Sequence, residues 1–125
     1  MRDRSFYDET VAAYMAAVDR LDPDAVMEFF AEDPILVVEP AGLVRRGRGE
    51  VRGALAHLLG DSTGMRHETL RLTVDREQDR VAIELNYRNT TKAGVMTVLH
   101  DSTHIQLDAE GKFTKVQFWL GHDIG

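Results

Sequence analysis

The sequence predicts an α+β fold in which helices cover one face of a strongly curved antiparallel sheet. Two observations predict it. In the first part of the chain, apolar residues recur every three or four positions, which is typical of amphipathic helices. From about residue 66 onward the apolar period changes to two, the period of strands. Helices followed by a run of strands favour the α+β class.

The first half of the chain predicts three helices and one strand. A helix over 6–21 carries apolar residues at helical spacing, namely Val11, Tyr14, Met15, Val18 and Leu21. Asp22-Pro23 breaks this helix and begins a second one over about 23–31, because Asp is a good cap and Pro suits the first helical position. A strand over 35–39 ends at Pro40. A Gly- and Arg-rich connection over 42–49 then leads into a third helix that closes at Gly60.

Four strands are expected in the second half, separated by turn signals at 77–79, 92–94 and 108–111. Their predicted ranges are about 66–75, 80–91, 94–107 and 113–120. Alternation separates two faces, and we expect the more apolar face to be concave. That face carries Tyr87, Asn89, Thr103, Val116 and Phe118.

Composition limits the function classes. A length of 125 residues suits a single domain spanning 1–125. The net charge of −6 argues against nucleic acid or an anionic membrane as the main partner. There is no cysteine, no apolar run long enough to span a membrane, and no signal-peptide core at the N-terminus. We therefore expect a cytoplasmic protein.

Three polar residues interrupt otherwise apolar patterns: Tyr14 in the first helix, Glu39 at the end of the first strand, and Asp101 within a later strand. A buried carboxyl group is costly to ionise, so a fold retains one only with a partner, a bound water or a use. A structural explanation exists for each: a solvated strand-end carboxylate, a core tyrosine, and a carboxylate paired with an arginine or a loop N–H. The functional explanation is an acid–base site that shares one pocket.

The segment AYMAAVDRLDPDAVMEFFAEDPILVVEPAG resembles the ketosteroid isomerase branch of the nuclear transport factor 2-like superfamily, and also its SnoaL-like polyketide cyclase group. The resemblance extends over about residues 10–121. It implies a cone-shaped α+β barrel whose interior holds an apolar ligand. It also implies that Tyr14 donates a hydrogen bond to an oxyanion and that Glu39 moves the proton. The family's second carboxylic acid aligns with Thr103, two residues after Asp101, which departs from the isomerase pattern.

The expected substrate-binding residues are Phe30, His57, Tyr87, Asn89, Thr103, Val116 and Phe118. His57 lies beside the apolar row of the third helix, as histidines do in related dehydratases, although a half-exposed helix histidine is also common. We expect no metal and no other cofactor. An apolar patch on the convex face, formed by Met96, Val98, Phe113 and Trp119, predicts a homodimer.

These observations favour a cofactor-independent enzyme that removes a proton next to a carbonyl group of a small apolar substrate, such as a polyketide, steroid or terpenoid. Isomerisation, dehydration and cyclisation are variants of that one step. Two alternatives remain open. The cone is a binding module that returns its ligand unchanged, or it is filled by side chains and serves as a dimerisation domain.

Overall fold

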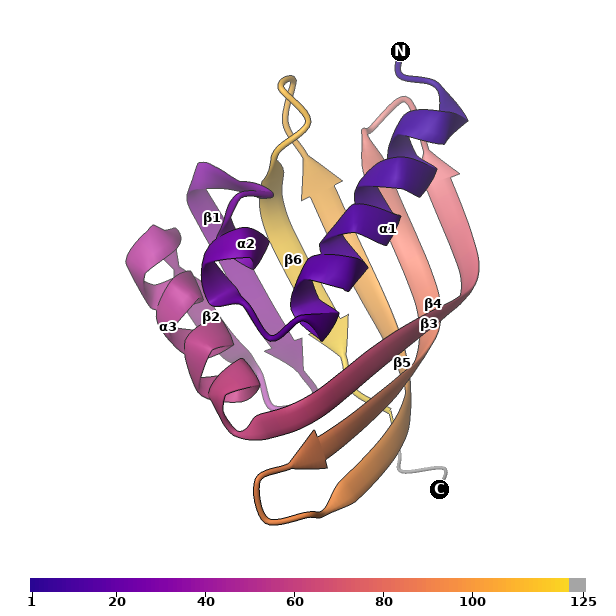
Figure 1. The fold of residues 1–125 in the computed structure, drawn as a ribbon. Coiled ribbons are helices and arrows are strands. Elements are labelled where there is room, and N and C mark those ends of the chain that lie inside the picture. The colour runs from indigo at the N-terminus through magenta and orange to yellow at the C-terminus, as the bar shows by residue number, and fades with distance from the viewer. Residues whose placement is uncertain (122–125) are drawn as a thin grey trace.

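The computed structural model describes residues 1–121 and confirms the predicted α+β class. Three helices, α1 (Arg4–Asp19), α2 (Pro23–Met27) and α3 (Gly47–Gly60), lie against one face of a curved sheet (Figure 1). The strands are β1 (Phe30–Glu39), β2 (Leu43–Arg46), β3 (Ser62–Asp75), β4 (Arg80–Thr91), β5 (Met96–Leu107) and β6 (Phe113–Trp119). Within these residues, no helix combines the length and apolar character needed to cross a membrane.

The six strands form one sheet in the order β2-β1-β6-β5-β4-β3. The pair β1–β6 is parallel and every other neighbouring pair is antiparallel. The sheet therefore joins the first strand of the chain to the last one, and its two longest hairpins, β3–β4 and β4–β5, form the opposite wall. This arrangement brings residues from every part of the sequence to one concave face.

The helix ends follow the local sequence. The Asp22 carboxylate accepts hydrogen bonds from the backbone N–H groups of Asp24 and Ala25 at 3.1 and 3.2 Å, so it caps α2 as expected. α2 is shorter than predicted, because the chain already enters β1 at Phe30. The connection after Pro40 contains β2, which the Gly- and Arg-rich composition did not predict.

The core lies between the helices and the concave face of the sheet. α1 contributes Tyr7, Val11, Tyr14 and Val18, and these pack against buried residues such as Ile83, Ile105 and Val116. The face predicted to be concave is therefore the buried one. Each side chain that the core buries adds hydrophobic stabilisation of roughly 1.5–3 kcal/mol when it is a large aliphatic or aromatic residue.

Phe113 is a correction to the predicted convex patch. Its side chain is 1% exposed and its ring contacts those of Tyr14, Phe29 and Phe30 in the core. A register shift between β5 and β6 is the cause, since Leu107 pairs with Phe113 whereas Gln106 pairs with Lys115. The extra residue inverts the alternation, and this turns Phe113 inward. Met96 and Trp119 remain exposed, at 60% and 44%, and the homodimer stays a prediction.

Candidate active site

A cavity of about 800 Å³ lies between α1, α3 and the concave face of the sheet. Its volume falls in the range of small-molecule sites. Most of the lining is hydrocarbon, including Val18, Leu36, Val38, Leu55, Leu59, Leu85, Leu99 and Phe118. A small set of polar side chains interrupts it, and these are Tyr14, Arg45, Glu50, His57, His67, Tyr87, Asn89, Thr97, Asp101 and Thr103.

The strongest polar contact at the cavity wall joins Asp19, the last residue of α1, to His67 on β3. Asp19 Oδ1 lies 2.6 Å from His67 Nδ1, and Asp19 Oδ2 accepts the His67 backbone N–H at 3.1 Å. The two side chains are 26% and 13% exposed. A carboxylate at Nδ1 holds the ring proton there and leaves Nε2 free to accept another proton. The pair is therefore a histidine base oriented by a carboxylate.

The Asp19–His67 pair could not be predicted from the sequence, and the register of β3 gives the reason. Leu72 and Val74 on β3 face the core, and strict alternation from them would turn His67 outward. A register shift between Thr69 and Arg71 adds a residue to β3, so that His67 pairs with Tyr87 on the inner face. Asp19 lies 48 residues away in sequence and gave no local signal.

Asp101, the candidate on β5, faces the cavity and is 8% exposed. Its Oδ1 accepts the backbone N–H of Gly121 at 2.9 Å, so the structural explanation of a loop N–H partner is partly met. Burial raises the pKa of Asp101, whereas the Gly121 hydrogen bond and the charges of His67 and His100 lower it. The net effect is a raised pKa, so Asp101 takes up a proton more readily than an ordinary aspartate, and its protonated form can donate a hydrogen bond or a proton.

Tyr14 also lines the cavity and is 1% exposed. Its ring makes edge-on contacts with Phe29 and Phe113 at centroid distances of 5.7 and 5.1 Å. Burial raises the pKa of the Tyr14 phenol well above its usual value, so the hydroxyl stays protonated. Among residues 1–121 it has no hydrogen-bond partner within normal distance, which leaves it available to a bound molecule.

Tyr87 stands beside His67, with ring centroids 5.0 Å apart. Burial, with the Asp101 and Asp19 carboxylates nearby, raises the pKa of Tyr87 to about 12. Tyr87 pairs with His67 on β3, and Asp101 pairs with Leu85, the neighbouring inward position on β4. Together with the Asp19–His67 contact, this register gathers Asp19, His67, Tyr87 and Asp101 into a single cluster. This cluster is the polar centre of the cavity.

Five of the predicted substrate-binding residues line the cavity: His57, Tyr87, Asn89, Thr103 and Phe118. The other two do not. Phe30 and Val116 are 3% and 0% exposed and belong to the packed core, so they support the site without reaching it.

Glu39 is a second correction, because it does not line the cavity. Leu36 and Val38 take the inner face of β1, so the next residue points to the outer face. There Glu39 lies beside Trp119 of the parallel strand β6, and its backbone carbonyl accepts the Leu120 N–H at 3.0 Å. Glu39 and Tyr14 therefore do not share one pocket as predicted. The candidate base that lines the cavity is His67.

This fold and cavity define an α+β cone with an apolar interior, as the resemblance to the nuclear transport factor 2-like superfamily implied. The chain belongs to the family of SnoaL-like domains, whose family model matches residues 11–116. No curated protein matches the sequence.

Solved structures share the fold over nearly the whole chain. SalBIII, described as an epoxide hydrolase/cyclase-like enzyme in pyran ring formation of the polyether salinomycin, is 25% identical, with 97% of this chain and 95% of that chain covered and a TM-score of 0.83. A hypothetical protein with a ketosteroid isomerase-like fold from Catenulispora acidiphila is 22% identical, with 93% and 86% covered and a TM-score of 0.78. AusH from Aspergillus nidulans is 13% identical, with 96% and 86% covered and a TM-score of 0.84.

Proposed function

We propose that the protein is a cofactor-independent acid–base enzyme that removes a proton next to a carbonyl group of a small, largely apolar substrate. The observation that carries the proposal is the Asp19–His67 pair at the wall of the apolar cavity, 2.6 Å between carboxylate and ring nitrogen. The existence of the cavity counts against a domain whose cone is filled by side chains.

In the proposed step, Nε2 of His67 takes the proton from the carbon next to the carbonyl. The C–H bonding pair becomes the C=C bond of an enol or enolate, and the carbonyl π electrons move onto oxygen. The protonated Asp101 carboxyl group donates a hydrogen bond to that oxygen, with Tyr14 as a further donor in the cavity. Asp19 stabilises the imidazolium that forms.

The enolate then has three outcomes that share this first step. Return of the proton from His67 to a different carbon completes an isomerisation. Transfer of that proton to a β-hydroxyl group, which leaves as water, completes a dehydration. Attack of the enolate carbon on a second carbonyl forms a C–C bond, breaks that carbonyl's π bond, and completes a cyclisation when the new alkoxide takes the proton from His67.

The experiment is a deuterium-exchange assay, which needs no knowledge of the product. Enolisable cyclic ketones such as 2-tetralone are first screened for binding, and exchange of the proton next to the carbonyl is followed by NMR in D₂O. We expect His67→Gln to slow exchange by roughly 10²–10⁴-fold, the usual contribution of a general base. Asp19→Asn should slow it in the same direction.

His104→Gln is the matched control, because His104 alternates with the inward-facing Thr103 on β5 and lies outside the cavity lining, with its Nε2 3.1 Å from Ser102 Oγ. It should leave exchange nearly unchanged. Thermal melts establish that each variant is folded. Equal exchange by wild type and His67→Gln for every ketone that binds would refute the proposal and favour the binding-module alternative.

A second candidate reaction is supported by the likeness to SalBIII. Here Nε2 of His67 takes the proton of a substrate hydroxyl group, and that oxygen attacks an epoxide carbon. The epoxide C–O bond breaks as Asp101 gives its proton to the departing oxygen, which yields a cyclic ether and an alcohol. Ring closure of a hydroxy-epoxide without any ketone exchange would select this reaction over the first.

A further inference from the structure

Arg45 on β2 is the one permanently charged cation that lines the cavity among residues 1–121. It pairs with Leu36 of β1, which lines the cavity too, so Arg45 lies on the inner face of its strand. Its guanidinium group carries a fixed positive charge and donates hydrogen bonds in a planar fork. A cation of this kind at the edge of a hydrocarbon wall is a candidate contact for a negatively charged part of the substrate.

Two neighbouring arginines already have structural partners, whereas Arg45 does not. Arg48 donates to three backbone carbonyls of α2 and β1, and Arg52 pairs with Asp24 at 2.8 Å. Arg45 donates to the backbone carbonyl of Val44, the residue before it, at 3.0 Å. Within residues 1–121, no carboxylate lies at ion-pair distance from its guanidinium group. The rest of that hydrogen-bonding fork is therefore available to a ligand.

Glu50 on α3 also lines the cavity and indicates which kind of anion fits. Its Oε1 accepts the backbone N–H of Arg46 at 3.2 Å, so this carboxylate is held at the start of α3. A negative charge at this position repels a doubly charged phosphate monoester more strongly than a singly charged carboxylate. The planar carboxylate also matches the guanidinium fork.

Arg45 is remote from the polar centre of the cavity. β2 is the edge strand beside α3, and three strand spacings separate it from β5 (Figure 1). At about 4.8 Å for each spacing, this amounts to about 14 Å of sheet. The row of paired residues that begins at Arg45 reaches β5 at Ile105, four residues from Asp101. A substrate that touches both Arg45 and Asp101 must therefore be elongated.

We propose that Arg45 binds a carboxylate group at the end of the substrate remote from the reacting carbonyl group. The hydrocarbon lining between Arg45 and Asp101 would then cover an apolar middle part. This inference rests on the proposed function and narrows the substrate class to elongated keto acids.

The test compares the binding of 6-(2-oxocyclohexyl)hexanoate with that of its uncharged methyl ester. Arg45→Gln and Arg46→Gln form a matched pair, because each removes one positive charge from β2. Arg46 pairs with Ile35, is exposed and does not line the cavity, so it lies on the outer face of the strand. Dissociation constants are measured by NMR titration of wild type and both variants, and thermal melts establish that each variant is folded.

We expect wild type to bind the acid about tenfold more tightly than the ester, a value suited to a charge-assisted hydrogen bond at a partly exposed group. Arg45→Gln should remove this preference, and Arg46→Gln should keep most of it. Added NaCl should weaken the preference in wild type, because salt screens charges that solvent reaches. The shorter probe (2-oxocyclohexyl)acetate should gain less over its own methyl ester, because its carboxylate cannot extend to Arg45 from the polar centre.

Three results would overturn the inference. They are a wild type that does not prefer the acid, a preference that persists in Arg45→Gln, and an equal loss of preference in the two variants, which would mean that only net charge matters. Binding is measured without turnover, so a failure of the exchange assay leaves the acid preference to be judged by itself. Exchange that depends on His67, combined with no acid preference, would refute only the role of Arg45.

Discussion

At the scale of single residues, the candidate chemistry depends on groups that are far apart in sequence. Tyr14 and Asp101 could be predicted because each interrupts an intact apolar pattern, which shows on which face its side chain lies. The Asp19–His67 pair could not be predicted, because the register shift at Thr69 and Arg71 hides the orientation of His67. The prediction for Glu39 was wrong because it followed the family resemblance, which implied a place in the pocket. The alternation of β1 places its side chain on the outer face.

Asp101→Asn tests the state of the buried carboxyl group. Burial raises its pKa in the folded protein above the unfolded value of about 3.9. The stability that the neutral acid contributes is therefore complete below that pH and is lost as the pH rises through the folded pKa. Asparagine keeps an oxygen for the Gly121 N–H but cannot ionise, so the variant should escape this loss.

Thermal melts between pH 3.5 and pH 8 measure the difference. We expect wild type and Asp101→Asn to melt alike at the acid end, and the variant to melt higher near neutral pH, by roughly 3–6 °C for each kcal/mol gained. The same variant should lose ketone exchange, because its amide is not a proton donor of comparable acidity. A variant that is less stable near neutral pH would show that the fold favours the ionised carboxylate.

At the scale of elements, sequence periodicity predicted the existence and order of all three helices and of five strands. Periodicity could not predict which side chains face the core in a strand that carries an extra residue. β3 and β5–β6 each contain a register shift, one hiding His67 and the other turning Phe113 into the core. β2 was missed because its four residues, Leu43–Arg46, have no run long enough for alternation to be seen.

Phe113→Ala tests the inward turn at the start of β6. Because Phe113 is 1% exposed and contacts three aromatic rings, we expect a loss of about 3–5 kcal/mol in the free energy of unfolding. Leu70→Ala on β3 is the control, since Leu70 is 50% exposed and should lose well under about 1 kcal/mol. Urea unfolding measures both. Similar small losses of unfolding free energy in the two variants would show that Phe113 lies on the convex surface after all.

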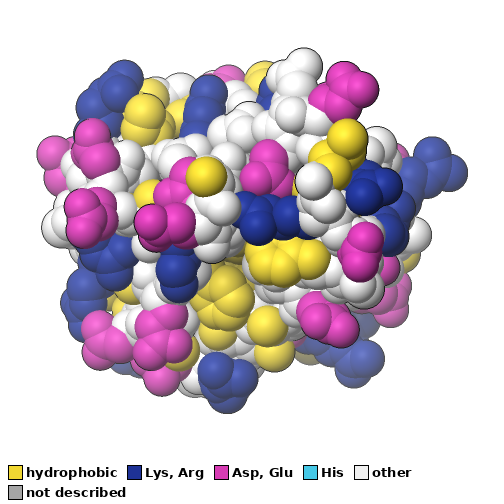
Figure 2. Space-filling model, turned by 90° about the horizontal axis from the view of Figure 1, so that it is seen from above, with side chains coloured by type: hydrophobic (Ala, Val, Ile, Leu, Met, Phe, Trp, Pro, Cys, Tyr) yellow, Lys and Arg dark blue, Asp and Glu magenta, His cyan; other side chains and the backbone are white. Residues whose placement is uncertain are grey.

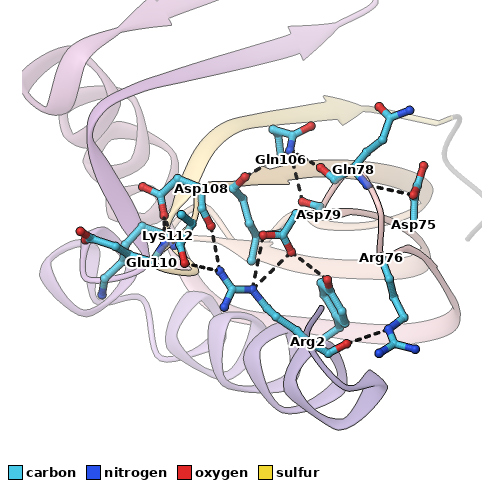
Figure 3. Close-up of polar contacts among 12 residues, drawn as sticks. Arg2, Asp75, Arg76, Gln78, Asp79, Gln106, Asp108, Glu110 and Lys112 are labelled. Carbon is cyan, nitrogen blue, oxygen red and sulfur yellow. Dashed lines mark hydrogen bonds and ion pairs between the residues drawn. The ribbon is translucent and has the colours of Figure 1, made fainter.

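At the scale of the whole molecule, the two ends of the cone do different things. At one end, Arg2 donates hydrogen bonds to Asp79 in the β3–β4 turn and to the backbone carbonyls of Asp108 and Ala109 in the β5–β6 turn (Figure 3). Acidic and basic side chains are interspersed over that end (Figure 2). The cavity, with Asn89 and Thr97, extends toward the β4–β5 turn at the other end. Hydrogen bonds of Arg2 thus link the turns at one end of the cone, whereas the other end encloses the cavity.

Two tyrosines of α1 allow this division to be tested. The Tyr7 hydroxyl donates to Asp79 Oδ1 at 2.7 Å at the end held by Arg2, whereas Tyr14 lines the cavity and its hydroxyl has no hydrogen-bond partner among residues 1–121. Both rings are 1% exposed, so Tyr→Phe leaves their packing intact and removes only the hydroxyl group.

We expect Tyr7→Phe to lower the free energy of unfolding by about 1.5–3 kcal/mol, the usual value of a hydrogen bond to a charged group, and to leave ketone binding unchanged. Tyr14→Phe should cost little or no stability and should slow ketone exchange, because it removes an oxyanion donor. Urea unfolding and the exchange assay on both variants decide the matter. Slowed exchange in Tyr7→Phe, with Tyr14→Phe unaffected, would show that the ends are coupled and that Tyr14 is a core residue alone.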